Sequence, residues 1–120
     1  MLYEIKNIKK YDDGIPIRWF CDDYFDLVLW FDDYKSITAF QLTYDRYYNP
    51  YALTWKDVGG FFHDKVDDGE IPGRNKKKSI LVPDGQFSKN EIAAKFKSES
   101  VKIDSKIRKF IYHKILLYDK

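Results

Sequence analysis

Residues Tyr24–Asp45 read YFDLVLWFDDYKSITAFQLTYD. They contain two runs of alternating apolar and polar residues on either side of Asp33–Ser36. Alternation with a period of two is typical of a half-buried β-strand. If the two runs form an antiparallel hairpin in which paired residue numbers sum to 69, one face carries Phe25 with Tyr44, Leu27 with Leu42, Leu29 with Phe40, and Phe31 with Thr38. A slip of one residue would place the two apolar rows on opposite faces, so the pattern predicts this register and a four-residue loop.

The opposite face of this hairpin is expected to be mixed rather than purely solvated. It would carry Tyr24, Asp26, Val28 and Trp30 from the first run, opposite Asp45, Thr43, Gln41 and Ala39 from the second. Tyr and Trp provide a large contact area at low entropic cost, and the chain has 10 Tyr and 3 Trp. We therefore predict a binding surface made of Trp19, Tyr24, Asp26, Trp30, Tyr47 and Tyr48. The alternative is that the tyrosines only cover the rim of a small core.

Segments outside the hairpin predict further strands, which are Leu2–Ile8, Ile17–Cys21, Tyr51–Lys56, Phe61–Val66 and Ile80–Val82. From Pro83 the apolar period changes to that of an α-helix. Ser88 and Glu91 match a capping box, and Phe87 and Ile92 match a hydrophobic staple, so a helix is expected after Ser88. Its inward residues would be Ile92, Ala93 and Phe96.

A second helix is expected after Asp104, which is a suitable N-cap residue. Its apolar stripe would consist of Ile103, Ile107, Phe110, Ile111, Ile115 and Tyr118. Strands followed by helices predict an α+β fold, in which an antiparallel sheet of about five to six N-terminal strands is covered on one face by two C-terminal helices. With 120 residues, the chain is expected to form a single domain, residues 1–120.

Composition also limits the cellular setting. No apolar run approaches the length of a membrane-spanning helix, and Met1–Lys10 lacks the apolar stretch of a signal peptide. Cys21 is the single cysteine, so it cannot form an internal disulfide. These features predict a cytoplasmic protein that does not bind membranes.

Charge is divided unevenly along the chain. Residues 1–70 contain 8 Lys and Arg against 14 Asp and Glu, a net charge of −6, while residues 71–120 contain 13 against 5, a net charge of +8. If the halves pack on one another they attract, whereas an outward basic half could bind phosphates or an acidic partner. The phosphate-binding alternative would use the helix lysines and the loop residues Arg74, Lys76, Lys77 and Lys78. The total charge of only +2 weighs against nucleic acid as a partner.

Two aspartate doublets, Asp22–Asp23 and Asp32–Asp33, resemble a catalytic pair of carboxylates. They bracket one predicted strand, and ten extended residues separate them by roughly 33 Å. A glycosidase pair requires carboxylates about 5–9.5 Å apart. We therefore interpret the doublets as charged strand ends.

A second alternative is a small enzyme or a metal-dependent activity centred on His63, Asp64 and the acids that follow. The spacing of these residues matches neither a zinc pattern nor an EF-hand loop. His113 is expected to be a half-buried packing residue, and Cys21 a buried, inert thiol. The nucleophile elbow, the phosphate loop and the dinucleotide-binding motif are all absent from the sequence.

The sequence therefore favours a non-catalytic interaction or ligand-binding domain. We predict no catalytic residue, no metal and no cofactor, and a protein partner or a second copy of the chain as the binding partner. Dimerisation through the mixed face of the sheet would cover Val28 and Trp30.

Overall fold

The computed structural model describes residues 1–6, 11–12, 14–67, 80–83 and 88–118. Its elements are β1 (Tyr3–Glu4), β2 (Tyr11–Asp12), β3 (Ile15–Cys21), β4 (Phe25–Phe31), β5 (Ile37–Tyr44), β6 (Tyr51–Lys56), β7 (Gly60–Asp67), β8 (Ile80–Pro83), α1 (Lys89–Glu99) and α2 (Ser105–Leu117). The strands pair antiparallel in the order β1-β3-β4-β5-β6-β7-β8, and β2 also pairs with β3.

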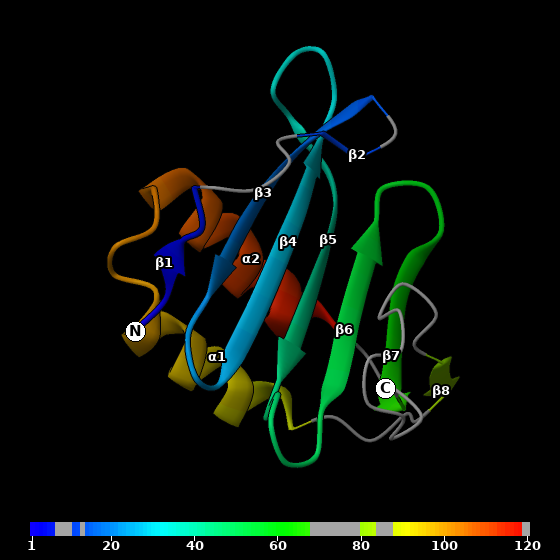
Figure 1. Cartoon of the computed structure of the whole chain (residues 1–120), viewed down its shortest axis with the longest axis vertical. Helices are drawn as coiled ribbons and strands as arrows, with labels where there is room; N and C mark the ends of the chain where they lie inside the picture. The colour runs from blue at the N-terminus through cyan, green and yellow to red at the C-terminus, as the bar shows by residue number, and fades with distance from the viewer. Residues whose placement is uncertain (7–10, 13, 68–79, 84–87, 119–120) are drawn as a thin grey trace.

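The predicted α+β architecture is confirmed. Six strands, β3 to β8, have four or more residues, and the two helices follow them in the chain. Figure 1 shows α1 and α2 on the same side of the sheet, behind β3, β4 and β5, while the near face of the sheet carries no helix. We call this near face the open face.

The predicted register of the β4–β5 hairpin is confirmed for six consecutive pairs, from Phe25 with Tyr44 to Trp30 with Ala39. The prediction is wrong at the last pair, because Phe31 lies opposite Ile37 and not Thr38. The connection thus contains five residues, and a bulge in β5 absorbs the difference.

The chemistry of this turn explains the bulge. The Asp32 carboxylate accepts hydrogen bonds from the backbone N–H groups of Tyr34 and Ser36, both at 2.9 Å. Lys35 then adopts a φ of 64°, the left-handed conformation that a type I turn followed by a bulge requires. The Asp32 backbone N–H donates to the Ser36 carbonyl, so Asp32 lies opposite Ser36. The alternation alone would place Asp32 opposite Ile37, one residue later.

The other strand predictions differ little from the structure, with one exception. β3, β6, β7 and β8 lie within two residues of their predicted bounds. The predicted strand Leu2–Ile8 is reduced to β1, because only Tyr3 and Glu4 pair with β3; part of the prediction lies outside the described residues. Leu2 precedes β1, is fully buried, and donates its backbone N–H to Glu99 O at 2.8 Å.

Both helices begin where the sequence predicts, but only one is capped as predicted. The Asp104 side chain accepts a hydrogen bond from the Lys106 backbone N–H at 3.2 Å. Ser88 precedes α1, yet its side chain makes no capping hydrogen bond, so the predicted capping box is wrong. The backbone of Ser88, at φ −81° and ψ 73°, departs from the extended conformation of a capping residue. Phe87 of the predicted staple lies outside the described residues.

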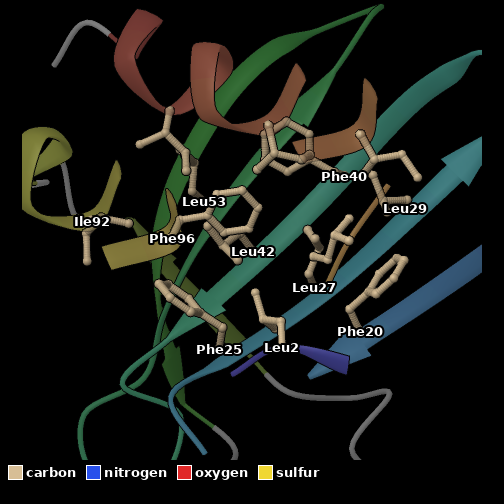
Figure 2. Close-up of a cluster of buried hydrophobic side chains, with 14 of the residues drawn as sticks. Leu2, Phe20, Phe25, Leu27, Leu29, Phe40, Leu42, Leu53, Ile92 and Phe96 are labelled. Carbon is tan, nitrogen blue, oxygen red and sulfur yellow. The ribbon is translucent and has the colours of Figure 1, made fainter. Parts of the chain in front are cut away.

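The core lies between the sheet and the helices (Figure 2). The sheet contributes Phe20, Phe25, Leu27, Leu29, Phe40, Leu42 and Leu53, and the helical segment contributes Ile92, Ala93, Phe96, Ile103, Ile107, Ile111, Ile115 and Tyr118. All the predicted inward residues of α1 are buried, as is the predicted stripe of α2 except Phe110. Phe110 is half-buried and packs edge-on against Trp55 with ring centroids 5.2 Å apart.

Substituting Leu42→Ala tests the predicted face assignment. Leu42 is fully buried at the centre of the core, so we expect the free energy of unfolding to fall by about 2–5 kcal/mol in urea titrations. The control Leu117→Ala removes the same atoms from a side chain that is 62% exposed, and should change stability by less than about 0.5 kcal/mol. Equal effects of the two substitutions would contradict the burial of this face.

Candidate functional site

Strand alternation and register define the open face. Directly opposed residues point to the same side of a sheet, so Trp30, Ala39 and Lys56 form one row across β4, β5 and β6. The next row consists of Trp19, Val28, Gln41, Thr54 and Phe62, and a third consists of Cys21, Asp26, Thr43, Ala52 and Asp64. This face carries apolar, polar and charged side chains together, as the sequence predicts.

A hollow of about 670 Å³ lies on the open face. Its apolar lining residues are Ile15, Trp30, Val58 and Phe62. The side chains of Ile15 and Phe62 are 46% exposed and that of Val58 is 85% exposed, although all three are large and apolar. A concave site with apolar walls and this volume is typical of ligand-binding pockets. We call it the open-face hollow.

Smaller and more polar residues also line the hollow. Gln41 and Thr54 face one another across β5 and β6, and Gln41 Nε2 donates to Thr54 Oγ1 at 3.1 Å. Ala39 precedes them on β5, and Thr38 Oγ1 donates to the Trp30 carbonyl at 3.4 Å. The hollow therefore combines large apolar side chains with hydrogen-bonding groups that can orient a ligand.

Three charged residues complete the lining, namely Lys56, Asp57 and Asp64. Within the described part of the chain, none of the three forms an ion pair. Lys56 and Asp57 are exposed and Asp64 is half-buried. The hollow can thus interact with a charged group of either sign on a bound ligand.

Of the six residues predicted for binding, the structure brings Trp30 to the hollow. Trp19 and Asp26 lie on the same face but interact with each other, because Trp19 Nε1 donates to the Asp26 carboxylate. Arg46 lies beside this pair; burial alone would lower its pKa, but a hydrogen bond with Cys21 and the charge of Asp26 raise it. Cys21 itself is buried, as predicted.

The remaining three predicted residues lie elsewhere. Tyr24 does not share a face with Trp30, and that placement is wrong: its ring packs edge-on against Phe25 and lies 4.4 Å from Lys95 Nζ of α1. Tyr24 belongs to the turn before β4, where strand alternation does not apply, and burial raises its pKa. Tyr47 and Tyr48 are 64% and 90% exposed in the β5–β6 connection, outside the hollow.

His63 and Asp64 do not converge. Consecutive residues of a strand point to opposite faces, so His63 lies on the core side of β7 and Asp64 lies in the hollow. His63 is buried, its Nε2 is 2.7 Å from the Tyr44 hydroxyl, and its ring stacks on Tyr51. The described residues contain no group of three side chains able to hold a metal ion. His113 is exposed, so its predicted half-burial is wrong.

The aspartate doublets are confirmed as strand-end features. Asp22 Oδ1 accepts hydrogen bonds from the backbone N–H groups of Tyr24 at 2.8 Å and Phe25 at 2.6 Å, between β3 and β4. Asp32 serves the β4–β5 turn in the same way. Side chains of this type mimic a backbone turn and satisfy donors that the strand pairing leaves unused.

Sequence reasoning missed three of the apolar residues that line the hollow, Ile15, Val58 and Phe62. Alternation in β7 could have placed Phe62 and Asp64 on one face, opposite His63, but the approach of β7 to Ile15 depends on the curvature of the whole sheet. The predicted phosphate contacts Arg74, Lys76, Lys77 and Lys78 lie outside the described residues, and their role stays a prediction.

Comparison of the chain with protein-family models, with curated proteins and with solved structures finds no match. Neither α1 nor α2, the helices of the described ranges, has the length and apolarity needed to cross a lipid bilayer. The site must accordingly be interpreted from its own geometry.

The substitution Asp22→Ala tests the strand-end interpretation. It removes the acceptor of two backbone donors, one of them buried, so the free energy of unfolding should fall by about 1–3 kcal/mol. Asp23→Ala is the matched control, because Asp23 is the exposed second member of the doublet and should have an effect below about 0.5 kcal/mol. Urea titrations of both variants that gave similar losses would contradict the interpretation.

Proposed function

We propose that this protein is a non-catalytic binding module that holds its ligand in the open-face hollow. The observation that carries the proposal is the gathering of exposed Ile15, Val58 and Phe62 around a concavity of about 670 Å³. Contiguous apolar side chains at a soluble surface are costly unless they serve an interaction. Scattered exposed apolar residues would need no such explanation.

The shape of the hollow favours a projecting ligand over a second copy of the sheet. Two sheets that pack face to face bring their side chains into close interdigitation. Two opposed hollows would instead enclose empty space at the centre of the interface, and the lost contacts would weaken the dimer. A small molecule or one side chain of a partner can fill the hollow without this loss.

The lining residues define the chemistry of the ligand. An apolar body would contact Trp30 and Phe62, and a polar group would bond to the Gln41–Thr54 pair. Lys56 and Asp64 can each attract a charge on the ligand, since neither is ion-paired with another described residue. The proposed ligand is therefore amphipathic.

This proposal assigns no catalytic residue. His63 is enclosed by Tyr44 and Tyr51 on the core side of the sheet, so it cannot act on a ligand in the hollow. We also propose a cytoplasmic location, which the single buried thiol of Cys21 supports.

The proposal can be tested with the amphipathic fluorescent probe anilinonaphthalene sulfonate. We expect saturable binding to the native protein, and we expect Ala39→Leu, which fills the hollow while adding apolar surface, to weaken it by about tenfold. Phe62→Ser should weaken binding through loss of an apolar wall. Fluorescence titration measures both effects, and circular dichroism shows that each variant is folded.

Leu117→Ser is the control, because it removes an exposed apolar side chain at the end of α2, away from the hollow. Its affinity for the probe should change less than about twofold. If Ala39→Leu instead strengthens binding, the probe reports general apolar exposure and the proposed site is wrong.

A further inference from the structure

Among the described residues, the sheet layer and the helical layer carry net charges of opposite sign. The described residues of the sheet layer, residues 1–67 with two gaps and residues 80–83, contain six Lys and Arg against eleven Asp and Glu, a net charge of −5. Residues 88–118, which form the helical layer, contain eight against three, a net charge of +5. Because both helices lie on one side of the sheet in Figure 1, the division along the sequence becomes a division in space.

Because of this layering, the total charge of +2 does not describe the charge that a partner would meet at the helices. The acidic sheet would oppose anion binding only if its field reached the outer surface of the helices. An α-helix is about 10 Å in diameter, whereas the Debye length at physiological ionic strength is about 8 Å. The solvent side of the helical layer is therefore largely screened from the acids of the sheet.

The helix α2 contains four cationic residues and no acidic residue: Lys106, Arg108, Lys109 and Lys114. Solvated helices commonly intersperse acidic and basic residues, because opposite charges one turn apart stabilise the helix and like charges destabilise it. Lys106 also lies in the first turn, where a positive charge opposes the helix dipole. Arg108 donates to Ser100 and to the Lys97 carbonyl, and Lys114 lies in the last turn over the Trp55 ring. The unfavourable charges that packing does not require are therefore those of Lys106 and Lys109.

Exposed basic side chains recur at regular intervals along this segment. Ile107, Ile111 and Ile115 face the core, and Lys106, Lys109 and His113 follow one another at intervals of three or four residues on the opposite side of the helix. Lys102 lies in the turn before the N-cap residue Asp104, four residues ahead of Lys106. We call these four residues the α2 basic stripe; all four are exposed. From Lys106 to His113 the stripe runs about 10 Å along the helix axis.

The lysines of the stripe form no ion pair with another described residue. The ion pairs among the described residues involve Met1, Arg18 and their acidic partners, and no lysine of the stripe. Asp104, the nearest acid in the sequence, caps the helix through the Lys106 backbone. Lys97 of α1 lies over the Tyr112 ring at 5.5 Å and adds a further cation beside α2.

We propose that the α2 basic stripe binds the phosphate backbone of nucleic acid without reading its sequence. A line of flexible ammonium groups suits successive phosphates, whereas a single phosphate requires donors that converge on one point. The stripe contains no Arg, Asn or Gln, which are the side chains that pair with base edges in two-point contacts. This site lies on the opposite layer from the open-face hollow, so the two proposals are independent.

An anionic membrane is the less favoured occupant of the stripe. A helix that lies in a membrane surface inserts an apolar side into the lipid. In α2 that side, Ile107, Ile111 and Ile115, is already buried against the sheet.

The experiment compares two triple variants of the full chain. K102Q/K106Q/K109Q neutralises the three lysines of the stripe, and the matched control K6Q/K35Q/K65Q neutralises three exposed lysines of the sheet layer that lie outside the hollow. Both lower the net charge equally. Fluorescence anisotropy with a labelled single-stranded oligonucleotide of about 20 nucleotides measures affinity between about 50 and 200 mM salt.

We expect the wild-type protein to bind with an affinity that falls steeply with salt. The stripe variant should bind at least about tenfold more weakly, and its log–log salt slope should be smaller by about 2, since each lost phosphate contact contributes about 0.7. The control should change less than about twofold. Thermal unfolding of the stripe variant should show an unchanged or raised Tm, because the substitutions relieve like-charge repulsion.

Three outcomes would overturn the proposal. These are equal weakening by both triple variants, which indicates a net-charge effect only; absence of binding by the wild-type protein at low salt; and stripe-dependent binding to phosphatidylserine vesicles without binding to the oligonucleotide. None of them bears on probe binding in the hollow, so failure here is distinguishable from failure of the proposed function.

Discussion

The pairing of β4 with β5 is the constraint on which the rest of the structure depends. Leu27 lies opposite Leu42 with both side chains fully buried, and the same register places Val28 opposite Gln41 on the other side of the sheet. Because side chains alternate strictly, one register determines the core that receives the helices and the surface that they leave open. The core and the open-face hollow are therefore two results of a single alignment.

The parts of the fold that follow from local periodicity were predictable from the sequence. The hairpin register, the apolar stripe of α2 and the Asp104 cap each depend on residues a few positions apart. The prediction is wrong where a side chain competes with the pattern, as Asp32 does by closing its turn one residue early. It is also wrong at Ser88, where the backbone conformation rather than the residue type prevents the cap.

The candidate site was less predictable than the fold. Trp30 was identified because it alternates with core residues, but Ile15 and Val58 come from the start of β3 and the β6–β7 turn. Their approach depends on how five strands twist together, which no local pattern encodes. Similarly, the division of charge is visible in the sequence, but only the packing of both helices on one face makes it a division between the described sheet layer and the helical layer.

The contact between Leu2 and Glu99 has a consequence for how the polypeptide acquires its structure. The two residues are 97 positions apart, yet their backbones are hydrogen-bonded and the Leu2 side chain belongs to the core. Contacts of such long range form late, because the loop between them must first close. During synthesis on the ribosome, the apolar core face of the β-sheet would stay exposed until the helical segment emerges. The nascent polypeptide would then be most prone to aggregation while the strands have emerged and residues 88–118 have not.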